Sequence, residues 1–285
     1  MRRPLPNWIS DREIGSRIAA KKHDITLITP MFGGGAETSV NDPVTPIRVP
    51  SIRGQLRFWW RVIRGADCNH GTLLKQESEI WGSTENPSPV KILVESSSLV
   101  EGLTGTQWCG SHPGLNYVLY NLSTRTGSRH SFTLSIHTDG ASEDIEAAMR
   151  AWVNLGGLGA RTRRGCGALY CAALPGNKWL EADIQSTERR EWPIIGETLR
   201  LSSTPVDPLD AWELLVNKWH QFRQVTRPSR DRDHMASPIL LRPIAVGPNQ
   251  AIPVIIRLEE PDGFETENQT AREFLRWARD GAATP

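Results

Sequence analysis

Apolar and polar positions along the chain follow two different periods, and together they predict a protein that mixes strands with helices. Short apolar segments in which β-branched and aromatic residues recur predict strands. They are His23–Thr29, Val90–Glu95, Asn116–Leu122, Ser131–His137, Ala168–Ala173, Pro238–Val246 and Ile252–Leu258. Segments with helical spacing or composition predict helices. They are Ile52–Arg64, Ser142–Leu155, Pro208–Arg223 and Ala271–Asp280.

The order of these elements favours an α+β fold. In the first part of the chain a strand, a helix, several strands, a second helix and a final strand follow one another, as in a ferredoxin-like sheet. The turn residues Pro175, Gly176 and Asn177 mark a boundary, so residues 1–175 are expected to form one domain and residues 176–285 a second one.

Composition restricts the class of protein. The 285 residues are 38% hydrophobic and 23% charged, and no apolar run approaches the roughly 20 residues that span a bilayer. No apolar signal core follows the basic start of the chain, so the cytoplasm is the expected location, with no membrane partner. The four cysteines include no CxxC pair, and Cys109 with His112 makes only a lone CxxH, so a zinc site is less favoured than incidental thiols.

Charge is distributed unevenly, although the net charge is only +1. Residues 1–64 contain 11 Lys and Arg against 5 Asp and Glu, whereas the remainder contains 22 against 27. A basic first quarter on a nearly neutral chain is typical of a localised anion-binding face, and ordinary scatter is the alternative explanation.

The segment from Arg48 to Arg64 contains five arginines and no acidic residue. On a helical wheel the last four arginines lie within an arc of about 80°, beside an apolar face. Like charges on one stripe repel, and no carboxylate stands at i+4 spacing, so an outside anion would stabilise the arrangement. Guanidinium groups bind phosphate oxygens bidentately and stack on bases, which indicates RNA. The alternative is that acidic residues of other elements neutralise the stripe.

Seven side chains of this segment are expected to contact RNA. They are Arg48, Arg53, Gln55, Arg57, Phe58, Arg61 and Arg64. Trp59 and Trp60 fall mostly on the apolar side of the wheel, so we expect them to pack in the core rather than stack on bases. Phe58 is the aromatic residue better placed to meet a ligand.

A second basic segment, GGLGARTRRGCG, covers residues 156–167. Its glycines would let backbone amides approach a phosphate chain, and its arginines would supply charge. The expected RNA contacts are Gly156, Gly157, Gly159, Arg161, Thr162, Arg163, Arg164, Gly165 and Gly167. The segment lacks the order of a Walker loop, and it follows a helix and precedes a strand, the reverse of a dinucleotide-binding fingerprint. The alternative is a tight helix-to-strand connection with incidental arginines.

Catalysis is the main alternative to binding. Cleavage of RNA without metal needs a general base and a general acid, commonly a histidine with a lysine or tyrosine. None of the seven histidines lies in either arginine-rich segment, although His23 and His234 could approach RNA in space. No nucleophile elbow, HExxH motif or paired carboxylates occur, so no catalytic residue is expected. A purely protein-binding scaffold would leave the arginine stripe unexplained.

Taken together, these segments resemble the RAMP proteins of CRISPR systems, in which a glycine-rich loop joins the last helix to the last strand of a ferredoxin-like fold. The resemblance is closest to the family that forms the first subunit of the type III-B Cmr effector complex. The matching segments are ITPMFGGGAE at 28–37, PIRVPSIRGQLRFWWR at 46–61, EIWGS at 79–83, GGLGARTRRGCG at 156–167 and ASPILLRP at 236–243. The string SIRGQLRFWW is the specific part, because the glycine loop alone indicates only the superfamily.

This resemblance implies two ferredoxin-like (RRM-like) domains, an N-terminal one over residues 1–175 and a reduced C-terminal one over residues 176–285. It implies a non-catalytic RNA-binding subunit of a ribonucleoprotein effector complex in antiviral defence, which contacts guide RNA near its 3′ end, target RNA or both. The implied partners are guide RNA, target RNA and the other Cmr subunits, and no cofactor or metal is implied. The alternative within the superfamily is a metal-independent endoribonuclease that processes CRISPR RNA.

Overall fold

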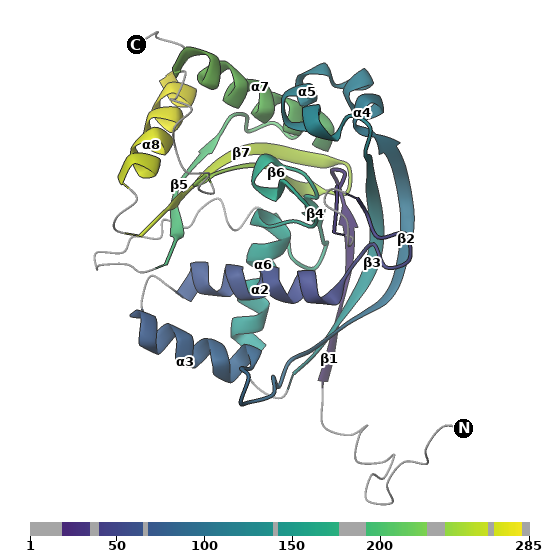
Figure 1. The fold of residues 1–285 in the computed structure, drawn as a ribbon, viewed down its shortest axis with the longest axis vertical. Coiled ribbons are helices and arrows are strands. Elements are labelled where there is room, and N and C mark those ends of the chain that lie inside the picture. Colours follow the sequence, from purple (N-terminus) through teal and green to yellow (C-terminus); the bar gives the residue numbers. More distant parts are fainter. Residues whose placement is uncertain are drawn as a thin grey trace, which may run out of the picture.

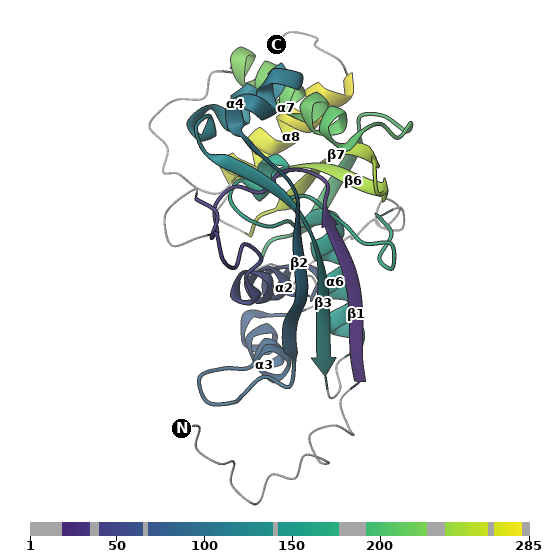
Figure 2. The ribbon, with the colours of Figure 1, turned by 90° about the vertical axis from the view of Figure 1, so that its right-hand side faces the viewer.

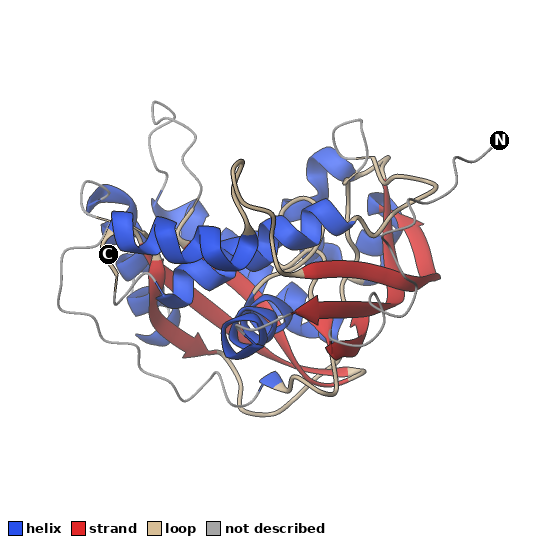
Figure 3. Ribbon diagram, turned by 90° about the horizontal axis from the view of Figure 1, so that it is seen from below, coloured by secondary structure: helices blue, strands red, loops and turns tan. Residues whose placement is uncertain are grey.

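The computed structural model describes residues 19–34, 40–64, 68–138, 142–176, 192–226, 237–261 and 265–280. Helices and two antiparallel sheets make up the fold (Figure 1), which confirms the expected α+β class. In the view from below, the strands gather in two groups with helices between and around them (Figure 3). His234, Asn177 and residues 35–37 of the first motif lie outside the described residues.

The first sheet contains four strands in the order β2-β3-β1-β4, and neighbouring strands are antiparallel. The strands are β1 (Ala19–Leu27), β2 (Lys91–Thr104), β3 (Thr126–Thr138) and β4 (Leu169–Tyr170). The helices between them are α2 (Val49–Arg64), α3 (His70–Trp81) and α6 (Ser142–Leu155). Helices α2 and α6 lie on the inner face of this sheet (Figures 1 and 2), where Ile25 and Leu134 share a core with Leu56 and Trp152.

The second sheet contains three strands in the order β5-β7-β6. Its elements are β5 (Ile194–Arg200), α7 (Pro208–Thr226), β6 (Ile239–Gly247), β7 (Gln250–Glu259) and α8 (Glu265–Asp280). Leu240 and Ile244 of β6 belong to the core that contains α2 and α6, whereas Leu241 packs with α7 and α8. Because both faces of β6 and β7 are covered, these strands are buried along nearly their whole length.

A group of short helices connects β2 to β3. They are α4 (Gly105–Ser111), η1 (Pro113–Leu115), α5 (Asn116–Leu119) and η2 (Tyr120–Leu122). The strand expected at Asn116–Leu122 is therefore wrong. Its apolar residues Val118, Leu119 and Leu122 are buried in the core that contains α7, while Tyr120 is 73% exposed. That pattern has the spacing of a helix, and the aromatic content of the segment obscures it in the sequence.

Other elements differ from the prediction mainly at their ends. Helix α2 begins at Val49 instead of Ile52, because Pro50 fits the first turn of a helix, where no intrahelical N–H bond is lost. Helix α3 and strand β5 were not predicted. Helix α3 begins where the Asn69 side chain accepts a hydrogen bond from the Thr72 amide at 2.9 Å. In the described part of the chain, no helix combines the length and apolar character required to cross a bilayer.

Candidate nucleic-acid interface

Helix α2 turns one face into the protein and carries its arginines along the neighbouring side. Trp59 and Trp60 are only 2% and 1% exposed, which confirms that they pack in the core. The Trp60 indole also donates a hydrogen bond to the Asp144 carboxylate of α6 at 3.1 Å. The tryptophans therefore anchor α2 to the sheet and to α6, and they are not available for base stacking.

Arg53 is engaged by the protein itself. Its guanidinium donates to the Trp81 carbonyl at 3.3 Å, the Ser88 hydroxyl at 3.1 Å and the Val90 carbonyl at 2.7 Å. Burial lowers the pKa of Arg53, although the group is still charged at neutral pH. Arg53 thus connects α2 to the end of α3 and to the residue before β2, and its contacts are those of a framework residue.

Arg57 and Arg61 share the carboxylate of Glu77 on α3. The Arg57 Nε lies 2.7 Å from one carboxylate oxygen, and an Arg61 nitrogen lies 3.7 Å from the other. Glu77 is buried, with 3% of its side chain exposed, whereas 37% of Arg57 and 27% of Arg61 remain open to solvent. Arg61 also stacks over the Trp192 ring at 4.2 Å. An acid from another element therefore compensates these two arginines in part, because one carboxylate faces two guanidinium groups.

The arginines at the two ends of the segment 48–64 differ. Arg64 pairs with Asp144 of α6 at 2.6 Å. Arg48 is exposed and donates to the Gly34 carbonyl at 2.8 Å, a neutral acceptor. Within the described residues, ion pairs supply two carboxylates for the five guanidinium groups between Arg48 and Arg64. A net positive charge therefore remains along the outer side of α2.

Three further residues of α2 border this charge. Gln55 is half-buried. The Phe58 ring packs edge-on against Trp59, with centroids 5.3 Å apart, and faces Trp192 at 6.4 Å, so only part of the ring faces solvent. Gly54 is exposed, and a Cβ atom added there would meet nothing within 4 Å. The surface beside the arginines is therefore open at Gly54 and partly closed at Phe58.

The glycine-rich loop is held tightly by residues 29–32. The Gly167 amide donates to the Pro30 carbonyl at 2.9 Å, and the Ala160 amide donates to the Phe32 carbonyl at 2.6 Å. Gly167 has φ +62°, and a Cβ there would collide with the Leu158 carbonyl. Gly159 and Gly165 also have positive φ, at +80° and +90°, and a Cβ at Gly156 or Gly157 would collide with packed neighbours. These glycines serve a compact helix-to-strand connection, the alternative stated above.

The arginines of the loop bind the second half of the protein. Arg161 donates to the Val118 carbonyl of α5, and Arg163 donates to the Ser237 carbonyl and lies 3.7 Å from Glu260. Arg164 donates to the Ile239 carbonyl of β6 at 2.9 Å and lies over the Trp219 ring at 4.7 Å. Burial lowers the pKa of Arg164 to about 10, and it also lowers the pKa of Arg163.

The two sets of arginines have their partners on different elements. The arginines of α2 have their partners on α3, on α6 and beside β2, whereas those of the loop reach α5, β6 and α7. Thr162 is half-buried, and its carbonyl accepts a hydrogen bond from Arg242, whose buried guanidinium lies below the loop. The loop is thus a junction between the two sheets.

The described histidines are mostly packed or paired. His23 and His130 are 3% and 6% exposed, and burial lowers the pKa of each. His112 lies 3.3 Å from Asp210, and His220 stacks on Tyr117 with centroids 4.2 Å apart. No group of three His, Cys, Asp or Glu that could hold a metal ion occurs among the residues that the structure describes.

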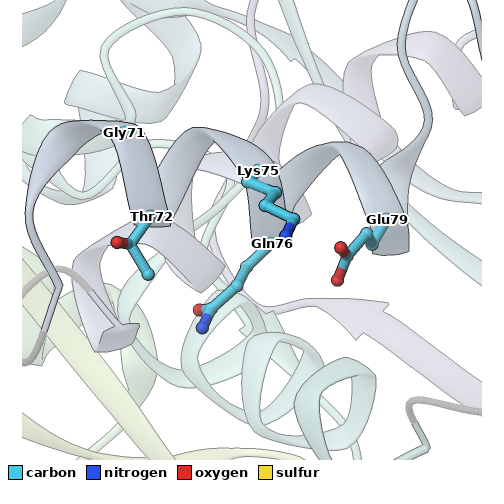
Figure 4. Close-up of a pocket in the computed structure, with 5 residues that line it drawn as sticks. All are labelled: Gly71, Thr72, Lys75, Gln76 and Glu79. Atoms are coloured by element: carbon cyan, nitrogen blue, oxygen red, sulfur yellow. The ribbon is translucent and has the colours of Figure 1, made fainter.

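A shallow pocket of about 410 Å³ opens on helix α3 (Figure 4). Thr72, Lys75, Gln76 and Glu79 extend from the helix around it, and Gly71 completes the described lining. One cation and one anion face this space, so the described lining favours neither an anionic nor a cationic ligand.

Four residues that make notable contacts in the structure were not singled out from the sequence: Glu77, Asp144, Tyr117 and His220. Only Glu77 is close to a motif that could have indicated it, EIWGS at 79–83.

The chain is similar to two curated proteins of Pyrococcus furiosus. The CRISPR system Cmr subunit Cmr1-2 is 27% identical over 180 residues, covering 53% of this chain and 94% of the relative. The CRISPR system Cmr subunit Cmr1-1 is 28% identical over 134 residues, covering 43% of this chain and 40% of the relative.

Solved structures share the fold. The crystal structure of Cmr1 from Pyrococcus furiosus in its apo form has a TM-score of 0.54 and 18% identity, covering 85% of this chain and 88% of that one. A chain in the cryo-EM structure of the type III-B Cmr-beta bound to cognate target RNA has a TM-score of 0.57 and 11% identity, covering 92% of this chain and 100% of that one. The model of the RAMP superfamily matches residues 24–170, slightly more than half of the sequence. This protein therefore belongs to the RAMP superfamily, as its motifs and glycine-rich loop led us to expect.

Proposed function

We propose that this protein is a non-catalytic, RNA-binding subunit of a type III-B CRISPR effector complex, with guide RNA, target RNA and the other Cmr subunits as its partners. Membership of the RAMP superfamily supports this proposal, together with the similarity to two Cmr1 subunits. The fold is also similar to that of a chain in a Cmr assembly bound to target RNA.

The proposal includes two ferredoxin-like units. In the first sheet, one strand, helices, two strands, a helix and a last strand give the order β2-β3-β1-β4, which is the arrangement of that motif. In the second sheet, the elements β5, α7, β6, β7 and α8 give the order β5-β7-β6. That order equals the same motif without its fourth strand, which supports a reduced second unit.

The observation that carries RNA binding is the uncompensated charge on the outer side of α2. Glu77 is buried beneath Arg57 and Arg61 and holds both guanidinium groups in place from one side. The solvent-facing sides of these groups remain free to donate hydrogen bonds to phosphate oxygens, because a guanidinium presents five donors in a fixed fork. Arg48 donates to the Gly34 carbonyl and helps to lower the pKa of Asp42, yet its side chain is exposed, so its charge is also available to a phosphate.

The expected contacts divide into two kinds. Arg48, Arg57, Arg61 and Arg64 would contact phosphates directly, with Gln55 and Phe58 at the border of the path. Gly54 leaves room for the RNA backbone to approach α2 closely. Arg53 and the loop arginines would act mainly by holding this surface in place, and the loop itself would offer its exposed residue Gly159.

Arg48→Ala is the sharpest test, because Arg48 is exposed and its side-chain hydrogen bond within the described structure is to one backbone carbonyl. Binding of a labelled single-stranded RNA is measured by fluorescence anisotropy at several salt concentrations. Each lost phosphate contact should reduce the salt slope by about 0.7. Arg125→Ala serves as the control, since Arg125 is an exposed arginine after η2. Equal affinities and slopes for both variants and the unchanged protein would contradict the α2 site.

Gly54→Ala tests the same surface without a change of charge. Alanine in a helix is favoured over glycine by roughly 1 kcal/mol, so the variant should unfold at a higher temperature. If RNA passes close to Gly54, the more stable protein should nevertheless bind RNA less tightly.

The proposal that the protein is non-catalytic is tested by incubating it with labelled CRISPR repeat RNA without metal. Discrete cuts that disappear in a single histidine variant would contradict it.

A further inference from the structure

Two aromatic side chains from separate elements stack at the surface where α5 meets α7. The rings of Tyr117 and His220 have centroids 4.2 Å apart and planes inclined by 19°. Tyr117 is 38% exposed and His220 is half-buried, so this pair is not part of the core. The Gln224 amide lies 3.2 Å from the His220 Nε2 atom and orients the imidazole ring. Figure 1 shows α5 and α7 side by side at this point.

The charges around the pair favour an anionic ligand. Residues 217–226 of α7 contain no acidic residue, and Arg223 lies about one turn after His220, whereas Lys218 is directed to the Trp277 ring of α8. Residues 116–126 contain no acidic residue either. The acids at the other end of α7 are engaged: Glu213 accepts the Gly114 amide at 2.6 Å, and Asp210 lies 3.3 Å from His112.

The glycine-rich loop contacts the residues next to this pair. Arg161 of the loop donates to the carbonyl of Val118, the residue after Tyr117. Arg164 lies over the ring of Trp219, the residue before His220, and Arg223 lies 5.9 Å from the same ring. The stacked pair is therefore bordered by guanidinium groups of the loop and of α7.

We infer that Tyr117 and His220 form a stacking platform for an unpaired nucleobase of single-stranded RNA, with Arg223 beside it as a phosphate contact. This inference rests on the proposed RNA-binding function and adds a second contact, separate from α2. Exposed rings bordered by cations bind single strands because every base has a face that can stack, whatever its sequence. Bases inside a duplex are already stacked, so the platform selects single-stranded segments.

Tyr117→Ala is the test, measured with a short labelled oligouridine by anisotropy over a range of salt concentrations. Loss of one stacked base should weaken binding roughly 5- to 150-fold. The salt slope should stay the same, because a stacked base releases no counterions. Tyr117→Phe should bind like the unchanged protein. Tyr120→Ala is the matched control, since Tyr120 is 73% exposed three residues later and makes no ring contact within the described structure.

Photo-crosslinking with 5-iodouridine in the same oligonucleotide locates the base, and the expected adducts are on the peptides that contain Tyr117 or His220. If Tyr117→Ala binds as tightly as the unchanged protein and adducts occur only on α2, the platform is refuted and the α2 site stands. If Tyr117→Ala weakens binding while Arg48→Ala does not, the α2 site fails and the platform stands. If Tyr117→Ala removes only the association with another protein subunit, the surface is a protein interface and the inference is overturned.

Discussion

Replacing Glu77 by glutamine should weaken the fold and strengthen RNA binding in the same protein. The carboxylate lies 2.7 Å from Arg57 and 3.7 Å from Arg61, and it is nearly inaccessible to solvent. Glutamine keeps the shape of the side chain but removes the charge. The two guanidinium groups then repel each other without compensation, and any phosphate on their outer side no longer faces a buried anion.

The magnitudes follow from the exposure of the three groups. Breaking a fully buried ion pair by removing one partner costs about 3–5 kcal/mol, and an exposed pair contributes at most about 1 kcal/mol. Because both arginines are about one third exposed, we expect a loss near 2 kcal/mol, or a melting temperature lower by roughly 5 °C. For a phosphate about 7 Å away and an effective dielectric constant of about 40–80, the lost repulsion corresponds to roughly 3- to 8-fold tighter binding.

Two measurements on one preparation separate these effects. Thermal unfolding followed by circular dichroism gives the stability, and anisotropy with single-stranded RNA gives the affinity and its salt dependence. Glu79→Gln is the matched control, because it changes the net charge equally from an exposed position on the same helix. The control should change stability little and raise the affinity less than Glu77→Gln does.

The reasoning would be refuted by a folded Glu77→Gln protein that binds RNA no more tightly than the Glu79→Gln control. Such a result would mean that the outer sides of Arg57 and Arg61 do not face RNA. An unchanged melting temperature would refute the other half of the argument, namely that the buried carboxylate stabilises the pair of guanidinium groups.

Three further outcomes test the framework around the site. Gly167→Ala should destabilise the protein by more than about 2 kcal/mol in urea unfolding, because its φ of +62° and the neighbouring carbonyl exclude a side chain. Arg164→Leu should lower the free energy of unfolding by about 2 kcal/mol, whereas the exposed Arg125→Leu should not. Burial lowers the pKa values of His23 and His130 in the folded protein, so at mildly acidic pH the unfolded chain binds more protons than the folded protein does. Stability should therefore fall as the pH drops from about 7 to 5, and a His130→Gln variant should show a shallower decline.

The elements that the sequence predicts well are those with a strong period. The bounds of α6, Ser142–Leu155, agree with the prediction, because its apolar stripe and its start at Ser142 both appear in the sequence. Helix α3 buries Leu73, Ile80 and Trp81 on one face, but the acidic Glu77 interrupts this stripe in the sequence. Its start is fixed by the Asn69 cap. The segment 116–122 has the composition of a strand, and only its packing against α7 reveals the helical spacing.

The candidate site was predictable in its side-chain directions but not in its charge balance. The wheel places Trp59 inside and the arginines outside. Trp59 is buried and Arg57, Arg61 and Arg64 are partly exposed, as expected, whereas the Arg53 guanidinium is bound by the protein. The neutralising acids, Glu77 and Asp144, come from positions 20 and 80 residues away from Arg57 and Arg64, and no local pattern connects such distant positions. For the same reason, the sequence cannot distinguish a glycine that leaves room for a ligand from one that leaves room for a neighbouring side chain. Gly156 is of the second kind, because a Cβ atom there would collide with the Trp59 ring.

The loop arginines have a consequence for the cooperativity of folding. A fragment that ends at residue 175 would retain every strand of the first sheet, yet it would lose the Ile239 carbonyl that Arg164 binds and the Trp219 ring beneath that guanidinium. It would also expose the face of α2 and α6 that packs against Leu240. We therefore expect the two sheets to unfold in a single calorimetric transition, and we expect the isolated first sheet to aggregate rather than persist as an independent domain.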